Sequence, residues 1–242
     1  MRQSAAIENL RAQIAQIEGV ATPRDVLPFG VDAIDQVLPG GGLASGALHE
    51  VAGSPELADD AAATVFIAGI LGRLEGMVVW SLRWRDLFAP ALHLAGLHPD
   101  RVIFVEAGSD THVLTAMEEC LRHAGLAGVV GELGKIGLTA SRRLQLAAEQ
   151  SNVPAFVLRR ACAIDAKGEG SAAMTRWRVR AAPSAPLGIP SLGRPRWALD
   201  LERARGGAAH SWIVESTDAQ GRIGLPADMV DRPRSAEDRR AA

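Results

Sequence analysis

The residues best placed to do chemistry form a loop that begins at Gly53, directly after a short apolar segment. Such a loop binds nucleotide phosphates when it reads G-x-x-x-x-G-K-[ST], because its backbone amides and its lysine surround them. This loop has no lysine, and it lacks the serine or threonine that would hold magnesium. Three carboxylates stand where phosphate charge would lie, and like charges repel strongly near a packed helix end. The residues of this degenerate loop are Gly53, Ser54, Pro55, Glu56, Asp59 and Asp60.

Hydrolysis of ATP on such a fold also needs a metal ligand and a carboxylate that positions water. The second apolar segment continues as Trp80 to Arg85 and offers no carboxylate before Asp86. Glu132 lies where a magnesium ligand is expected, but a single glutamate at a strand end is more often structural. We therefore predict no catalytic residue, no metal site, no cofactor and no ATPase activity. Weak anion binding by the amides of residues 53–57 stays open, although Ser54 and its acidic neighbours also suit an ordinary helix N-cap.

Arginines that stand beside tryptophans form the second group of candidates. They comprise Arg83, Trp84 and Arg85, the pair Arg159 and Arg160, and the alternating run Arg176, Trp177, Arg178 and Arg180. Arginine and tryptophan at strand ends can grip phosphates and stack a base of single-stranded DNA. The same residues are enriched at protein interfaces. The third alternative is a solvated basic face with Trp177 in the core, and the sequence leaves all three open.

An apolar stripe marks the beginning of the chain. Ile7, Leu10, Ile14 and Ile17 recur at helical spacing, so we expect residues 1–20 to form an N-terminal helix. Residues 21–28 contain two prolines and are expected to be a linker. The stripe has two equal interpretations, because it can pack on the chain's own sheet or dock on a neighbouring subunit or partner.

Composition restricts the class of protein. The 242 residues contain no apolar run long enough to span a bilayer, the first residues are polar, and the two cysteines have no metal spacing. We expect a cytoplasmic protein with no membrane partner. The net charge of −2 is uneven, since residues 1–150 hold 11 Lys and Arg against 18 Asp and Glu, whereas residues 151–242 hold 15 against 10. That asymmetry predicts a basic surface on the C-terminal part.

Alternating apolar and helical segments predict an α/β fold. Strands are expected near 47–52, 77–81, 102–106, 127–132 and 154–158, with helices near 56–74, 86–95, 110–124 and 139–151. Short apolar strands separated by helices are typical of βαβ units, so the sheet should be mostly parallel with helices on both faces.

Three further strands are expected at 174–181, 196–203 and 210–216, where polar and apolar residues alternate. We expect them to pair antiparallel and to extend one edge of the sheet. Residues 29–230 would then form one core. Residues 231–242 are polar and rich in Arg and Asp, and are expected to be a disordered tail.

Several of these runs, taken in order, resemble the ImuA family, the RecA-like accessory proteins of bacterial SOS mutagenesis. The similar runs are Leu27 to Asp35, Gly40 to Leu43, Gly46 to Val51, Thr139 to Glu149, Leu158 to Arg160, Met174 to Val179 and Gly193 to Trp197. Together they cover about residues 25–216, and the lysine-free loop lies among them.

The resemblance implies a RecA-like, phosphate-loop-type sheet in a non-catalytic adaptor for SOS-induced error-prone translesion DNA synthesis. Its expected partners are a Y-family polymerase homologue of the ImuB type, an error-prone replicative-type polymerase, RecA and single-stranded DNA. Two alternatives remain at this stage: a divergent RecA-family ATPase, and a cell-division inhibitor similar to SulA. A shared fold alone does not choose among them.

Overall fold

The computed structural model describes residues 25–160, 170–184 and 193–226. The predicted N-terminal helix with Ile7, Leu10, Ile14 and Ile17 lies outside these residues, as does the predicted tail at 231–242. Within the range predicted as a linker, β1 (Val26–Leu27) pairs antiparallel with β2 (Leu43–Ala44), so this part of the range is a short strand. Between them lie α2 (Asp32–Asp35) and a 3₁₀ turn, η1 (Pro39–Gly41).

An eight-stranded sheet forms the centre of the molecule, with the order β10-β9-β8-β3-β7-β6-β4-β5. The strands are β3 (Leu48–Ala52), β4 (Val78–Leu82), β5 (Val102–Glu106), β6 (Gly128–Leu133), β7 (Ala155–Arg159), β8 (Thr175–Ala182), β9 (Arg196–Ala204) and β10 (His210–Glu215). The six strands from β8 to β5 run parallel, and β9 and β10 join antiparallel. The predicted extension is confirmed, except that β8 joins β3 in parallel rather than antiparallel.

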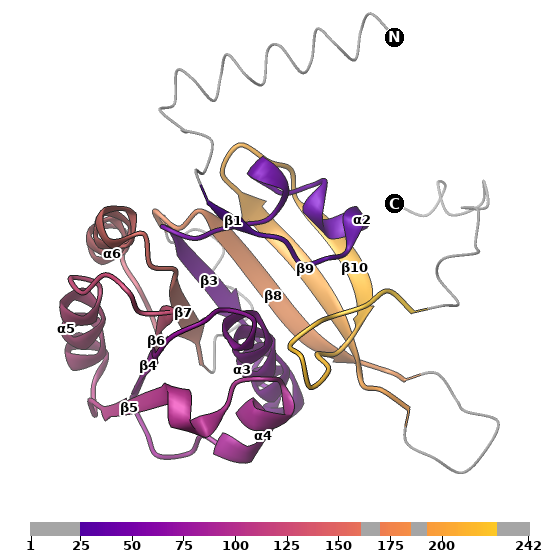
Figure 1. Ribbon diagram of the computed structural model, residues 1–242, viewed down its shortest axis with the longest axis horizontal. Helices are drawn as coiled ribbons and strands as arrows, with labels where there is room; N and C mark the ends of the chain where they lie inside the picture. The colour runs from indigo at the N-terminus through magenta and orange to yellow at the C-terminus, as the bar shows by residue number, and fades with distance from the viewer. Residues whose placement is uncertain (1–24, 161–169, 185–192, 227–242) are drawn as a thin grey trace, which may run out of the picture.

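Helices cover both faces of this sheet, as predicted (Figure 1). They are α3 (Leu57–Gly72), α4 (Ala89–Leu94), α5 (Asp110–Cys120) and α6 (Leu138–Ser151), with a 3₁₀ turn η2 (Pro99–Arg101) before β5. The larger apolar core lies under α3 and α4, and the second lies under α5 and α6. No helix among the described residues is long and apolar enough to cross a membrane.

An aromatic cluster forms the centre of the larger core. The ring of Trp177 on β8 lies 5.6 Å from that of Phe29, 5.8 Å from Phe66 on α3 and 6.2 Å from Trp212 on β10. Trp177 is fully buried, and its indole nitrogen donates to the hydroxyl of Thr175. Of the three alternatives for this run, the burial of Trp177 agrees with its placement in the core and contradicts a contact of this ring with DNA or a partner. Its face of β8 lies under α3, so the ring contributes hydrophobic burial instead.

His49 on β3 lies within the sheet and takes part in a chain of hydrogen bonds that runs from Trp177 through Thr175 to Ala44. Its Nδ1 lies 2.7 Å from the Thr175 hydroxyl, and its Nε2 donates to the Ala44 carbonyl at 2.8 Å. Both ring nitrogens are satisfied when the ring is neutral and carries its proton on Nε2. Burial lowers the pKa of His49 from 6.5 to about 4, and the bond to Ala44 opposes this only in part. His49 is thus a core residue whose two ring nitrogens both have hydrogen-bond partners.

We predict that this histidine makes the protein sensitive to mild acid. Because its pKa is lower in the folded state, its contribution is complete above pH 6.5 and is lost as the pH falls toward 4. Between pH 7.5 and 5.5 the free energy of unfolding should fall by about 1 kcal/mol. Urea denaturation at both pH values measures this decline in the free energy of unfolding. A His49→Gln variant should lack this decline, whereas the exposed His123→Gln variant should keep it; equal slopes would refute the assignment.

Candidate functional site

The degenerate loop joins β3 to α3. Counting the phosphate-binding pattern from Gly53 places Asp59 at the lysine position and Asp60 at the serine or threonine position. The loop packs tightly on the first turn of α3. A Cβ at Gly53 would lie 2.6 Å from the Asp59 carbonyl carbon and oxygen, so only glycine fits.

The acidic side chains of α3 are held by the rest of the protein. Asp59 is buried, and its carboxylate accepts the backbone amide of Ala181 on β8 at 2.7 Å. Ser54 accepts the amide of Glu56 at 3.1 Å within the loop, and Glu56 itself is the N-cap residue of α3. The interpretation of Ser54 as the cap of this helix is therefore wrong. Asp59 lies in the first turn of α3, where a negative charge suits the helix dipole, and its hydrogen bond with Ala181 also links α3 to β8.

Arg160, directly after β7, is surrounded by three carboxylates from three parts of the chain. Its guanidinium lies 2.6 Å from Asp60 on α3, 2.9 Å from Asp86 after β4, and 3.1 Å from Glu132 on β6. The other oxygen of Glu132 accepts the indole N–H of Trp80 at 2.9 Å. The positions that correspond to the magnesium-binding residues of a phosphate loop thus hold an internal cation.

Burial shifts the pKa values of the carboxyls in this cluster. It raises the pKa of Glu132, where the Trp80 hydrogen bond and the Arg160 guanidinium oppose the rise in part, and that of Asp60, where the guanidinium opposes it in part. Burial alone would lower the pKa of Arg160, but Glu132, Asp60 and Asp86 together raise it. Among the residues that the structure describes, no group of His, Cys, Asp or Glu is arranged to hold a metal ion. Glu132 itself lies between Trp80, which donates to one carboxylate oxygen, and Arg160, which pairs with the other.

The remaining candidate arginines do not form a free basic face. Arg159 is buried and lies 3.9 Å from Glu50, which Arg176 approaches to 3.2 Å. Further along β8, Arg178 lies 2.6 Å from Glu202 and donates to the Gly53 carbonyl.

The last arginine of this row, Arg180, lies 2.7 Å from Asp200. A guanidinium that is already paired with a carboxylate gains little from a phosphate. The basic surface predicted on β8 is therefore largely neutralised by its neighbouring strands.

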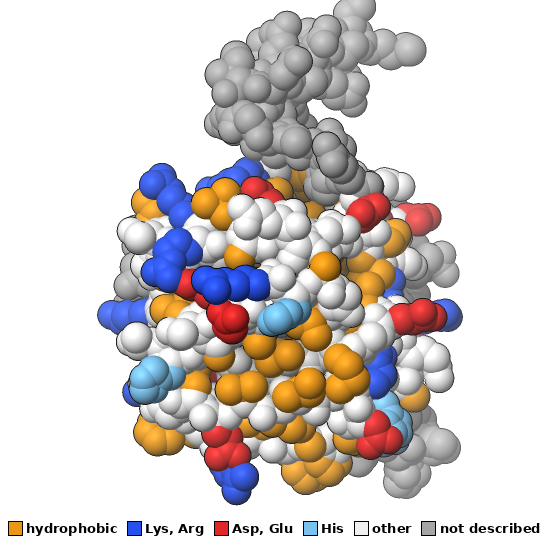
Figure 2. Space-filling view, turned by 60° about the vertical axis from the view of Figure 1, so that its left-hand side comes forward, with side chains coloured by type: hydrophobic (Ala, Val, Ile, Leu, Met, Phe, Trp, Pro, Cys, Tyr) orange, Lys and Arg blue, Asp and Glu red, His pale blue; other side chains and the backbone are white. Residues whose placement is uncertain are grey.

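The third group, Arg83 to Arg85, lies beside an open edge of the sheet. β5 is the last strand in the order and pairs with β4, so one of its long sides has no strand partner within the described part of the chain. Ile103 and Phe104 of this strand are exposed on opposite faces, at 47% and 38%. Figure 2 brings forward the side on which β5 and α5 lie, and shows a patch of hydrophobic side chains with charged groups at its margin.

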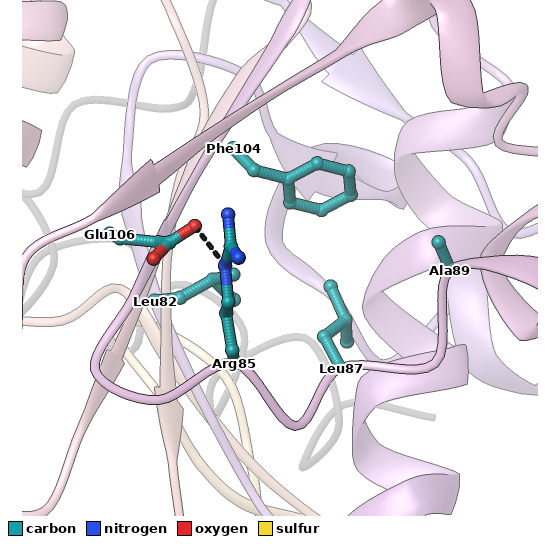
Figure 3. Close-up of a pocket in the computed structure, with 6 residues that line it drawn as sticks. All are labelled: Leu82, Arg85, Leu87, Ala89, Phe104 and Glu106. Carbon is teal, nitrogen blue, oxygen red and sulfur yellow. Dashed lines mark hydrogen bonds and ion pairs between the residues drawn. The ribbon is translucent and has the colours of Figure 1, made fainter.

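A cavity of about 310 Å³ opens beside this edge. Its lining comprises Leu82, Arg85, Leu87, Ala89, Phe104 and Glu106, with the Phe104 ring on one side and the Arg85–Glu106 ion pair on the other (Figure 3). Trp84 and Phe88 next to it are 62% and 69% exposed. Arg83 lies over the Trp84 ring at 5.3 Å and pairs with Asp110 at 3.0 Å. We call Trp84, Phe88, Ile103, Phe104 and the cavity the β5 edge surface.

Sequence reasoning found Arg83, Trp84 and Arg85 but missed Ile103 and Phe104. The segment 102–106 is as apolar as the neighbouring strands, which predicts burial on both faces. Only the strand order shows that it is an edge, and no local signal could have found it.

We predict that removal of the central cation destabilises the protein. In an Arg160→Ala variant, Asp60 and Glu132 would remain partly or fully buried without a counter-charge, which should cost about 3 kcal/mol of unfolding free energy. The deficit should narrow as the pH falls, because the raised pKa values let these carboxyls take up protons. Urea denaturation of Arg160→Ala and of the control Arg180→Ala, a half-exposed single pair, measures the difference. Equal losses in the two variants would contradict the central role.

Comparison with known proteins supports this architecture. The chain is 42% identical over 214 residues to Protein ImuA of two strains of Caulobacter vibrioides, NA1000 / CB15N and ATCC 19089 / CIP 103742 / CB 15. The match covers 83% of this chain and 87% of each relative. No model of a protein family matches the chain.

Among solved structures, the fold is similar to that of the RadB recombinase. The TM-score is 0.57 at 18% sequence identity, and the match covers 83% of this chain and 99% of the other. At this identity the likeness establishes the fold alone. The identity and extent of the sequence match show that this chain belongs to the ImuA family.

Proposed function

We propose that this protein is a non-catalytic RecA-like adaptor in SOS-induced error-prone translesion DNA synthesis. The observation that carries the proposal is the guanidinium of Arg160 among Asp60, Asp86 and Glu132, in the place where a phosphate-loop protein holds magnesium. Membership of the ImuA family points to the pathway, and the charges around the degenerate loop argue against a reaction with ATP. The protein would act by holding partners together.

A bound triphosphate would meet two obstacles here. It would have to separate Arg160 from its three carboxylates or lie beside all of them, and it would find Asp59 where a lysine normally reaches the terminal phosphates. Asp59 is also fixed by the Ala181 amide, which prevents it from simply turning away. Negative charge on both sides makes binding unfavourable at neutral pH.

We predict that the purified protein does not bind or hydrolyse ATP. Calorimetric titration with MgATP should show a dissociation constant weaker than about 1 mM, which corresponds to about −4 kcal/mol. An Arg160→Gln variant should not gain binding, because loss of the guanidinium leaves Asp60, Asp86 and Glu132 without their cation and increases the negative charge that a triphosphate would meet. Sub-millimolar binding by the unaltered protein, with magnesium-dependent turnover, would favour the divergent ATPase instead.

The β5 edge surface is the part of the molecule best suited to hold a protein partner. An uncovered strand edge offers backbone groups to a further strand, and the exposed aromatic side chains add hydrophobic contact. An exposed tryptophan beside arginines is typical of interface hot spots. We assign this surface to one of the expected partners: the ImuB-type polymerase homologue, the error-prone replicative-type polymerase or RecA.

Tethering explains how such a protein would work without a reaction of its own. An adaptor that binds a polymerase and a lesion-bound RecA filament makes their encounter intramolecular. The effective concentration then rises without any new catalytic step. Direct contact with single-stranded DNA is not required by this scheme.

We predict that changes on the β5 edge surface abolish partner capture. In Trp84→Ala/Phe104→Glu the apolar contact is lost and a charge faces the partner, so recovery of the ImuB-type polymerase homologue in a pull-down should fall about tenfold or more. Leu57→Glu, an exposed leucine on α3, is the control. Full recovery with the double variant would remove this surface from the proposal. Filamentation of undamaged cells on induction of the chain would favour the SulA-like inhibitor.

A further inference from the structure

A second cavity, of about 450 Å³, lies away from the degenerate loop. It is bounded by α6, by the segment that leads into β8 and by the end of β9. Its lining comprises Leu138, Arg142, Gln145, Leu146, Glu149, Ser171, Ala172, Arg203 and Arg205. The first five residues come from α6, and the others from the segment before β8 and the end of β9. We call it the α6 groove.

The arginines of this groove differ from those of the β5 edge surface and of β8. Arg203 donates to the Ser171 carbonyl at 2.8 Å, and Arg205 donates to the Ala172 carbonyl at 3.1 Å. Arg142 is exposed. Across the described residues, none of these three guanidiniums has a carboxylate within ion-pair distance.

A guanidinium carries five N–H donors, so each of these side chains has several left for a ligand. Among the described lining residues Glu149 is the one carboxylate, and it accepts a hydrogen bond from Gln145 at 2.7 Å. The groove therefore carries a net positive charge that the described residues do not neutralise. Its ligand should be anionic.

On the face of α6 that lines the groove, leucine side chains lie on either side of the charged Arg142. Leu138, Arg142 and Leu146 follow one another at four-residue steps and form one stripe of the helix. Both leucines are exposed, at 41% and 56%. The described residues of the lining include no aromatic ring on which a nucleic-acid base could stack. This combination fits a peptide better than single-stranded DNA.

We propose that the α6 groove binds an acidic peptide segment of a partner protein, with carboxylates that pair with Arg142, Arg203 and Arg205 and apolar side chains that cover Leu138 and Leu146. Leu138 and Glu149 are about 17 Å apart along the helix, a distance that an extended peptide covers with about five residues. The proposal adds a second docking surface to the adaptor. It depends neither on the silent loop nor on the β5 edge surface.

The test uses fluorescence anisotropy of the full chain with a labelled peptide of about ten residues in which Asp and Glu alternate with Leu. Binding should be strongest at low salt and should weaken about tenfold or more in Arg142→Glu/Arg203→Glu. Leu138→Ser/Leu146→Ser should weaken it too. Arg142→Glu alone keeps the test valid if the double variant fails to fold, because the Arg142 side chain makes no hydrogen bond or ion pair with another described residue.

Two matched controls separate the outcomes. Arg122→Glu reverses an exposed arginine outside the groove and should leave binding unchanged. Phe104→Glu should also bind the peptide normally, so a failure of the β5 edge surface is distinguishable from a failure here. Equal binding by all variants, or binding of a lysine-leucine peptide, would overturn the proposal. Tighter binding of an oligothymidylate of about ten nucleotides, lost in Arg142→Glu/Arg203→Glu, would assign the groove to nucleic acid instead.

Discussion

The ion cluster around Arg160 joins more of this molecule than any other polar interaction described. One guanidinium connects α3 through Asp60, the segment after β4 through Asp86, and β6 through Glu132. Its planar array of donors is suited to several carboxylates at once. Because Asp60 and Glu132 are largely buried, the repulsion between them has to be offset by a cation. In a phosphate-loop protein the corresponding region is organised by magnesium and a nucleotide. Here the chain supplies its own charge, and the loop is held in place without a ligand.

This arrangement changes the meaning of the arginine content. Arginine supplies nearly all the positive charge, and the C-terminal part has an excess of it. Most of the arginines that are candidates for partner or DNA binding pair with a carboxylate on a neighbouring strand or helix, as Arg178 does with Glu202 and Arg180 with Asp200. Net charge counts residues, whereas a ligand experiences only the charge that the protein has not balanced. By that measure, and among the described residues, the α6 groove has more unbalanced positive charge than the row on β8.

The two proposed docking surfaces would bind their partners by different interactions. The β5 edge surface combines a strand edge that has no strand partner among the described residues with exposed Trp84, Phe88 and Phe104, so it favours a strand with apolar side chains. The α6 groove combines charge with two leucines and favours an acidic segment. They lie on different elements, so one partner would not exclude the other by sharing residues. A scaffold that carries two such surfaces suits the proposed adaptor.

The sequence by itself determined what depends on near neighbours along the chain. Local periodicity placed every strand of the main sheet and its four helices to within a few residues, and the missing lysine after Gly53 is a property of the chain alone. Only the tertiary structure decided what depends on distant segments. The alternation around Trp177 shows that β8 has two different faces, but α3 decides which one is buried. Residues 102–106 look like a central strand, and the strand order makes them an edge. In the sequence nothing distinguishes Arg160 from the other 23 arginines, because pairing between residues far apart in sequence leaves no local pattern. Only folding brings Asp60, Asp86 and Glu132 to it.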